Sequence, residues 1–269
     1  MMKKSIFSLD SPALAKHYEE TSVTRQFRVG RMLIEALGVH AGDRVLDVGC
    51  GTGLLTEYVA QLAGPQGSVR GIDVLATRID IARSRSHATL SFDIGDVYDL
   101  GSHPPGGYDV VYLNAVFHWF AEKIRPLQQI HRVLRPGGRL GIWTGSKGHP
   151  KLTQVIRRQV LARPPYSTYA ESRQGGLYRV SAAELGALLE ETGFTIHKIE
   201  LCPNTSIQPT ADAAIAASQA ATFGNFLGHL PEPLRMLAQA EIRAELERHR
   251  QPEGIHEGGA QLLAVASTR

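Results

Sequence analysis

The segment VLDVGCGTG, residues 45–53, is the part of the sequence whose residue types and spacing most clearly indicate chemistry. Glycine has no Cβ, so a glycine turn lets a ligand approach the backbone closely, and a helix expected to start at Leu54 offers free N–H groups. The spacing is G-x-G-x-G, unlike the G-x-G-x-x-G of dinucleotide sites, and no lysine follows Gly53 as in phosphate loops. A ligand site is therefore predicted here. The alternative is a tight strand-to-helix turn, for which Asp47 just before the glycines would be unusual.

Two further acidic residues stand where the next apolar runs end. Asp73 lies at the end of the run 69–74, and Asp96, followed by Val97, comes after the run 89–94. The Asp73 carboxylate could accept both hydroxyls of a ribose, and Asp96 could accept from the amine of an adenine that packs on Val97. The alternatives are a surface acid that caps the next helix and an ordinary Asp turn. The favoured interpretation is a nucleoside-containing cofactor.

Strand-like and helix-like periodicities alternate around these residues. We expect strands at 44–49, 69–74, 89–94, 108–113 and 139–143, and helices at 24–38, 54–62, 75–85 and from near Pro126 to about 134. Repeated βα units imply an α/β fold, in which a parallel sheet carries helices on both faces. Ligands of such sheets bind outside the carboxyl ends of the strands, so the glycine segment and both acids would lie at one edge.

The second half is less regular and predicts insertions. A helix is expected at 151–161, a loop at 163–178, a helix from the capping box 181–184 to Gly193, and strands at 194–201 and 261–267. About sixty mostly helical residues separate the last two strands, and so long a connection indicates an insertion with a purpose. We therefore expect an N-terminal helical cap at 1–38, a cofactor-binding core at 39–145, an insertion at 146–180, further core at 181–204, a helical lid insertion at 205–258 and the last core strand at 259–269.

The motifs DVGCGTG, GIDV, GDVYDL, YDVVYLNAVFHW and RVLRPGGRLGIW occur in this order within residues 40–145. The series resembles the motif set of the class I S-adenosylmethionine-dependent methyltransferases, of the small-molecule type with a core like those of trans-aconitate and ubiquinone-biosynthesis enzymes. The resemblance implies a Rossmann-like three-layer sandwich whose seven-stranded, mostly parallel sheet has an antiparallel last strand.

The same resemblance implies roles for individual residues. Gly49 and Gly51 would approach the methionine part of the cofactor, Asp73 would bind the ribose, and Asp96 with Val97 would hold adenine. The backbone at Asn114 would face the methionine amino group. The remaining cofactor-binding candidates are Tyr18 on the first helix, Asp47, Cys50 and Val74.

The segment after the fourth strand narrows the acceptor. Nucleic-acid amino-methyltransferases carry Asn or Asp, two prolines and an aromatic residue there, whereas this chain has NAVF at 114–117. The difference favours a small molecule with an oxygen, nitrogen or carbon nucleophile, a carboxylate among them. His118 and Trp119 resemble the segment of the trans-aconitate type. His118 is the catalytic candidate, because histidine transfers protons near neutral pH, and a cavity-lining role is the alternative.

Four arginines of the first insertion could clamp an acidic substrate: Arg157, Arg163, Arg173 and Arg179. Solvated surface arginines are the alternative interpretation.

Composition sets outer limits on the function. The net charge is +3 and the basic residues are scattered, so a nucleic-acid partner is not expected. No run of about 18 apolar residues predicts a membrane span. Two cysteines, Cys50 and Cys202, suit a reducing cytoplasm, disfavour an arsenite methyltransferase and, with scattered histidines, predict no metal site. A NAD-type oxidoreductase and a non-catalytic cofactor-binding protein are the alternatives, and the protein is expected to be a monomer or homodimer.

Overall fold

The computed structural model describes residues 23–174, 177–222 and 226–269 of the 269-residue chain. Its strands are β1 (Arg44–Val48), β2 (Ser68–Asp73), β3 (Leu90–Ile94), β4 (Tyr108–Asn114), β5 (Leu134–Gly145), β6 (Phe194–Pro203), β7 (Ser206–Gln208), β8 (Arg250–Gln251), β9 (Gly254–Glu257) and β10 (Ala260–Thr268). Its helices are α2 (Val23–Leu37), α3 (Leu54–Ala63), α4 (Ala76–Ala82), α5 (Ile124–Val133), α6 (Leu152–Leu161), α7 (Ala170–Gln174), α8 (Ala182–Glu191), α9 (Ala211–Ala221) and α10 (Glu232–Arg248). Short 3₁₀ turns are η2 (Arg83–Arg85), η3 (Phe117–Trp119) and η4 (Tyr166–Thr168).

A seven-stranded sheet forms the core, in the order β3-β2-β1-β4-β5-β10-β6. The strands β1 to β5 pair in parallel, whereas β10 is antiparallel to both of its neighbours. The predicted α/β fold, with a mostly parallel sheet and an antiparallel last strand, is therefore confirmed. The strand order reverses between β1 and β4, which is the position where open α/β sheets bind ligands.

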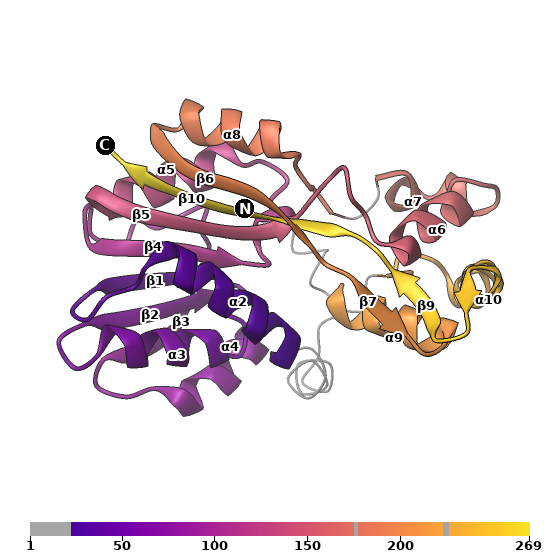
Figure 1. Ribbon diagram of the computed structural model, residues 1–269, viewed down its shortest axis with the longest axis horizontal. Helices are drawn as coiled ribbons and strands as arrows, with labels where there is room; N and C mark the ends of the chain where they lie inside the picture. The colour runs from indigo at the N-terminus through magenta and orange to yellow at the C-terminus, as the bar shows by residue number, and fades with distance from the viewer. Residues whose placement is uncertain (1–22, 175–176, 223–225) are drawn as a thin grey trace.

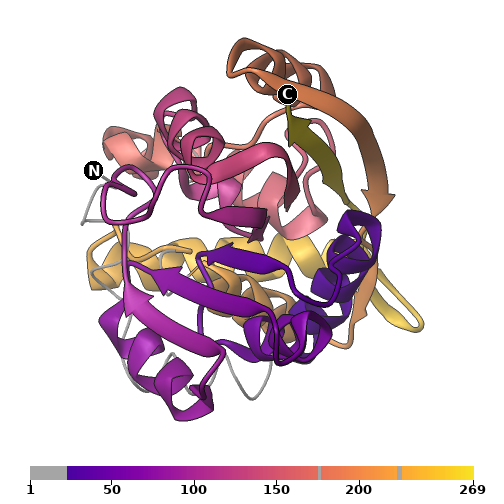
Figure 2. The same ribbon diagram turned by 90° about the vertical axis from the view of Figure 1, so that its left-hand side faces the viewer.

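Helices cover both faces of this sheet, giving three layers (Figures 1 and 2). Successive side chains of a strand point to opposite faces. Val45 of β1 accordingly belongs to the apolar cluster that includes α2, α3 and α4, and Leu46 belongs to the cluster that includes α5 and α8. Asp47 again points to the α3 side, where it meets Thr56. The strand register thus places a carboxyl group beneath the start of α3.

Local signals account for most element boundaries. The capping box is present at α8, where Ser181 Oγ accepts from the Glu184 N–H at 3.2 Å and the Ser181 N–H donates to Glu184 Oε2 at 2.7 Å. Helix α5 begins at Ile124, so Pro126 lies in its first turn, where a missing N–H is tolerated. The RPGG segment at 135–138 lies between the helix expected to end at about 134 and the strand expected from 139, and it belongs to β5, which pairs with β4 at Leu134 and again from Arg139.

A smaller lobe stands beyond one end of the sheet (Figure 1). It holds α6, α7, α9 and α10 around its own apolar cluster, which includes Ile156, Ile215 and Ile242. Here two expectations need correction. Residues 205–258 are not wholly helical, since β7, β9 and β8 form a three-stranded sheet, and the expected loop at 163–178 contains η4 and α7.

The added strands follow from the geometry of their neighbours. The antiparallel strands β6 and β10 lead out of the main sheet, and the Asn204 N–H still bonds to the Gly259 carbonyl oxygen at 2.8 Å. Pairing then resumes between β7 and β9. Strands of two to four residues are too short to show a period of two, so the sequence pattern could not reveal them. Among the described residues, no helix has the length and apolar character needed to cross a membrane.

Candidate active site

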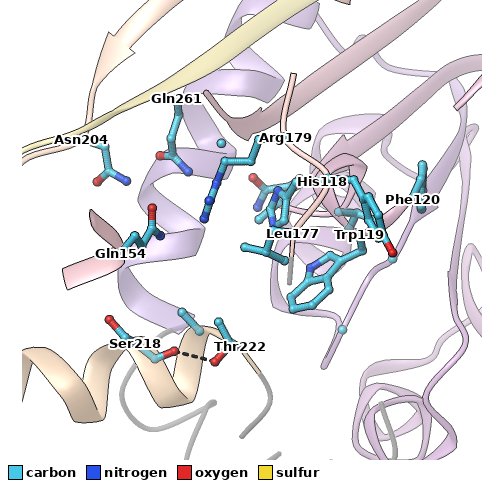
Figure 3. A pocket seen from close by; sticks show the side chains of 18 of the residues that line it. His118, Trp119, Phe120, Gln154, Leu177, Arg179, Asn204, Ser218, Thr222 and Gln261 are labelled. Atoms are coloured by element: carbon cyan, nitrogen blue, oxygen red, sulfur yellow. Dashed lines mark hydrogen bonds between the residues drawn. The ribbon is translucent and has the colours of Figure 1, made fainter. Parts of the chain in front are cut away.

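A cavity of about 550 Å³ opens at the carboxyl ends of β1, β2 and β4 and extends to the lobe. This volume falls within the range of roughly 300–1,000 Å³ that is usual for small-ligand sites. The core side contributes the loop 49–52 and the segments 73–75 and 114–116. The lobe side contributes Gln154, Asn204, Ser218 and Thr222, which Figure 3 shows, and also Arg157. The cavity therefore has one wall in each part of the molecule.

The loop between β1 and α3 is the first element of this site. The N–H groups of Gly49 and Cys50 both donate to the carbonyl oxygen of Ile72, at 2.7 and 3.0 Å. Gly49, Gly51 and Gly53 have φ values of +77°, +57° and +86°, in the left-handed region that favours glycine. The backbone conformation of this loop therefore favours glycine at all three positions of the G-x-G-x-G spacing.

The three glycines differ in what a side chain would meet. A Cβ at Gly49 would lie 2.3 Å from Val116 Cγ2, and one at Gly53 would lie 2.7 Å from Phe92 Cζ. A Cβ at Gly51 would meet nothing within 4 Å, and Gly51 lines the cavity. Two of the glycines therefore make room for protein neighbours, and Gly51 leaves open the space in which a ligand could approach the backbone.

Asp73 lies at the end of β2 and lines the cavity beside Val74. Its Oδ2 accepts from the Gly51 N–H at 3.0 Å, and its Oδ1 accepts from the Leu75 N–H at 2.9 Å. A carboxylate oxygen can accept more than one hydrogen bond, so Asp73 still has capacity for ligand hydroxyls. The carboxylate thus both holds the glycine loop and faces the cavity.

Asp47 is buried beneath the loop, where its side chain is the centre of a hydrogen-bonded cluster. The hydroxyls of Tyr112 and Thr56 both donate to its Oδ2, at 2.6 and 2.7 Å. Burial raises the pKa of Asp47 to about 7, although these two hydrogen bonds act in the opposite direction. Its carboxyl group therefore titrates near neutral pH, and its geometry indicates support of the loop as well as contact with the cavity.

Cys50 also lines the cavity, with its side chain partly buried. Burial, reinforced by the charges of Asp47 and Asp73, raises the pKa of the Cys50 thiol well above its usual value. The thiolate is the reactive form of cysteine, so this side chain remains a protonated, weakly nucleophilic thiol.

The end of β4 approaches the cavity through its backbone. Asn114 and Ala115 both line the cavity, and Ala115 has a φ of +61°, unusual for a residue with a Cβ. The Ala115 N–H donates to the Trp143 carbonyl oxygen at 2.8 Å, which fixes this turn against β5. A small residue here keeps the chain close to the cavity.

The two predicted adenine-binding residues differ in whether they line the cavity. Val97 is buried and lines the cavity, whereas Asp96 is not among the lining residues. Asp96 Oδ1 accepts from the Tyr98 N–H at 3.0 Å, which is the turn that was the alternative interpretation. The adenine role of Asp96 stays a prediction. Tyr18 lies outside the described residues.

His118, in η3, faces the cavity from the core side. Its Nδ1 shares a hydrogen bond with Thr144 Oγ1 at 3.1 Å, and its carbonyl oxygen accepts from the Tyr178 N–H at 2.8 Å. Burial lowers the pKa of His118 to about 3, and the positive charges of Arg179 and Lys123 add to this effect. The imidazole is therefore neutral near pH 7 and is a weak base in this state.

The four candidate arginines have different surroundings. Arg157 and Arg179 line the cavity, whereas Arg163 is exposed and pairs with Glu241 at 2.9 Å. The side chain of Arg173 lies outside the described residues. The suggested four-arginine clamp thus reduces to two residues within the described part of the chain.

Several polar residues of the cavity were not singled out in the sequence. Figure 3 shows Gln154, Asn204, Gln261, Ser218 and Thr222 around the space into which Arg179 extends. They come from α6, the β6–β7 connection, β10 and the α9 region. No motif marks them, because only the folding of the lobe brings these segments together.

Together, the strand-end cavity, the open position at Gly51 and the Asp73 carboxylate define an α/β protein with a site for a nucleoside cofactor. Among the described residues, no cluster of His, Cys, Asp or Glu side chains could hold a metal ion.

Comparison with known proteins identifies a methyltransferase domain in the core of the chain. Residues 45–138 match the model of a methyltransferase domain. The chain is 36% identical over 99 residues to a trans-aconitate 2-methyltransferase of Deinococcus radiodurans, covering 37% of this chain and 36% of that one. It is 35% identical over 161 residues to a ubiquinone/menaquinone biosynthesis C-methyltransferase of Ectopseudomonas mendocina, covering 58% and 62%. Residues 45–138 therefore form a methyltransferase domain, and the chain is similar over this part to the S-adenosylmethionine-dependent methyltransferases.

A solved structure agrees with this assignment at the level of the fold. The S-adenosylmethionine-dependent methyltransferase from Aquifex aeolicus aligns with a TM-score of 0.53 and 21% identity, covering 70% of this chain and 91% of that one. The chain spans between 36% and 51% of the length of several curated relatives that it matches. The family cofactor is S-adenosylmethionine, and the open space at Gly51 beside the Asp73 carboxylate fits it.

Proposed function

We propose that the protein transfers the methyl group of S-adenosylmethionine to a small molecule bound between the sheet and the lobe. The supporting observation is that one cavity extends from Gly51 and Asp73 to Arg179 and the polar residues of the lobe. Cofactor and acceptor can therefore occupy neighbouring parts of one cavity. Relatives named for trans-aconitate methylation and for quinone biosynthesis are consistent with a small acceptor.

We assign the cofactor to the core side of the cavity. The backbone at Gly49 and Gly51 would lie beside its methionine part, Asp73 would accept from the ribose hydroxyls, and Val97 would pack on adenine. Asn114 would face the amino group through its backbone. When bound, the cofactor supplies an electrophilic methyl group on a sulfonium. The task of the chain is then to hold the acceptor in line with that group and to exclude water.

His118 is assigned a positioning role on the acceptor side. A base whose pKa is about 3 removes protons poorly near pH 7, whereas a neutral imidazole can still donate or accept a hydrogen bond. The bond between its Nδ1 and Thr144 Oγ1 fixes the ring. This arrangement suits a nucleophile that is already deprotonated or neutral, on oxygen, nitrogen or carbon.

The proposal also covers the kind of acceptor and the oligomeric state of the protein. The acceptor would be free in the cytoplasm and not part of a nucleic acid or a membrane, because the basic residues form no stripe. The protein would act as a monomer or a homodimer. Size-exclusion chromatography with light scattering measures the latter directly, and a larger assembly would contradict it.

Calorimetric titration with S-adenosylhomocysteine and NAD tests the cofactor assignment. The protein should bind S-adenosylhomocysteine but not NAD. Asp73→Ala should weaken that binding by roughly 1–3 kcal/mol, because the ribose hydroxyls lose a charged acceptor. Asp93→Ala is the matched control, since Asp93 ends near the same sheet edge but pairs with Arg70 at 2.8 Å and does not line the cavity. Equal affinity in wild type and Asp73→Ala would refute the ribose assignment.

Incubation with labelled S-adenosylmethionine and a metabolite library tests the transfer itself. A product one methyl group heavier than its precursor, formed only in the presence of the protein, is expected. Tight S-adenosylhomocysteine binding without transfer to any library member would instead indicate a non-catalytic cofactor-binding protein.

A further inference from the structure

Two arginine side chains line the acceptor part of the cavity without a carboxylate partner. Arg157 lies on α6, and Arg179 lies just before Val180, which bridges to Ser146. Both residues are half-buried. Among the described residues, neither guanidinium forms an ion pair, whereas Arg163 in the same part of the chain pairs with Glu241. Desolvated arginines are usually paired with an anion, so this arrangement favours the binding of an anionic ligand.

The structure holds both guanidinium groups in place. Arg157 Nε donates to the Phe226 carbonyl oxygen at 2.5 Å, and its guanidinium lies 5.5 Å from the centre of the Phe226 ring. Arg179 lies over Gly145 at the end of β5, where a Cβ would come within 2.9 Å of its Nε. A side chain at position 145 would displace the Arg179 guanidinium. The Arg157 guanidinium is therefore held by its contacts with Phe226, and the Arg179 guanidinium packs against the backbone at Gly145.

The electrostatic state of the pair supports the same interpretation. Burial lowers the pKa of Arg179 to about 10. Burial also lowers the pKa of Arg157 to about 10, and the charge of Arg179 contributes to this decrease. Each guanidinium remains charged near neutral pH, so two desolvated positive charges face one cavity. An anion between them would replace lost hydration and offset their repulsion.

Among the described residues, no other charged group of the cavity forms an ion pair with either guanidinium. Asp47 and Asp73 lie at the glycine-loop end, and both oxygens of Glu257 accept hydrogen bonds from Thr153. The cations Lys151 and Arg158 also line the cavity, as does Lys147, which pairs with Glu184. The other polar side chains of the acceptor end are amides and hydroxyls, which can donate to an anion.

We propose that Arg157 and Arg179 bind an anionic group of the methyl acceptor, so that the substrates are small organic acids with a carboxylate or phosphate group. This inference rests on the proposed methyl-transfer function. The planar guanidinium matches either anion with two parallel hydrogen bonds, which a lysine cannot reproduce. The bound anionic group holds the acceptor in the cavity, and it also shields His118 from the charge of Arg179. The imidazole should consequently titrate at higher pH when the acceptor is bound.

Binding to the protein already saturated with S-adenosylhomocysteine tests this proposal. The probes are a panel of di- and tricarboxylates, sugar and enol phosphates, inorganic phosphate, and the neutral methyl esters of the same carboxylic acids. At least one anion should bind, and its neutral ester should not. A panel in which no anion binds, or in which esters bind as well as acids, overturns the proposal. Binding of carboxylates alone or of phosphates alone identifies the source of the anion.

Variants locate the binding group. Arg179→Gln should weaken binding of the anion at least about tenfold. Arg179→Lys should restore only part of the lost affinity. Gly145→Ala keeps both charges but displaces Arg179, so it should weaken binding of the anion as well. Arg163→Gln is the matched control and should change nothing. Anion affinity that is the same in Arg179→Gln and wild type would overturn the proposal.

The cofactor provides a separate readout. Each variant should retain the S-adenosylhomocysteine affinity of wild type, because Arg179 and Gly145 face the acceptor end. If the wild-type protein does not bind S-adenosylhomocysteine, the proposed function is refuted. Loss of the anion alone, with the cofactor bound, would refute only the arginine site.

Discussion

Gly51→Ala is the sharpest perturbation of the cofactor site, because the structure separates its effect on folding from its effect on binding. An added Cβ at Gly51 would meet no protein atom within 4 Å and would project from a residue that lines the cavity. At Gly49 the same methyl group would lie 2.3 Å from Val116 Cγ2. The first substitution should therefore obstruct the ligand, and the second should disturb the protein.

The expected magnitudes follow from the backbone. A left-handed conformation costs a residue with a Cβ about 1–2 kcal/mol. Alanine also restricts the unfolded chain, which returns about 0.4–1 kcal/mol. Gly51→Ala, at a φ of +57°, should thus lower the free energy of unfolding by about 1 kcal/mol. Gly49→Ala adds the clash with Val116, a further loss of about 1–3 kcal/mol.

Urea unfolding and calorimetric titration with S-adenosylhomocysteine measure the two effects. Gly42→Ala is the matched control, since Gly42 has a φ of +88°, open space around its Cβ position and no part in the cavity. Gly51→Ala should match Gly42→Ala in stability and bind S-adenosylhomocysteine at least about tenfold more weakly, equivalent to about 1.4 kcal/mol. If Gly51→Ala binds as tightly as Gly42→Ala, no ligand approaches the loop at this point and the reasoning fails.

Two further perturbations concern titratable groups of the cavity. The folded pKa of Asp47 is raised to about 7, above its usual value, so its protonated form favours folding and that stability is lost as pH rises towards and above 7. Asp47→Asn should remove this dependence in urea unfolding between about pH 5 and pH 8, and an unchanged pH profile would show that the carboxyl group is solvated. His118→Asn should lower turnover about tenfold or more while leaving S-adenosylhomocysteine affinity intact. Wild-type turnover in this variant would exclude the positioning role of His118.

The core of the fold could be predicted from the sequence because its determinants are local. A buried parallel strand followed by a glycine turn and a helix is encoded within residues 45–62, and the same unit recurs along the chain. The order of motifs then fixes which strand ends share an edge. Asp73 and Asn114 consequently lie at the cavity as expected. Their ligands are part of the proposed function.

The environment of a predicted residue was less accessible to sequence reasoning. Asp96 could not be distinguished from an ordinary turn residue, and its Oδ1 does accept from the Tyr98 N–H. The hydrogen bonds that Asp47 accepts from Tyr112 and Thr56 join residues 65 and 9 positions away, so no local pattern shows them. The low pKa of His118 likewise results from burial in the folded chain and, to a smaller extent, from the charge of Arg179, a residue of another segment.

The lobe could not be predicted in detail because it depends on long-range strand pairing, and this pairing also bears on how the site works. A hinged lid would require a flexible connection, but β6 and β10 run side by side from the main sheet, the Asn204–Gly259 bond continues their ladder, and β7 pairs with β9 beyond it. Opening the whole lobe would break these hydrogen bonds together. Thr144, which holds His118, pairs with Leu262 of the same ladder, and Gln261 lies next to it in the cavity wall. The cavity wall that we assign to the acceptor is therefore an extension of the sheet that carries the wall assigned to the cofactor. Under the proposed function, such a shared framework would set the distance between nucleophile and methyl group, which is the geometric precision that methyl transfer requires.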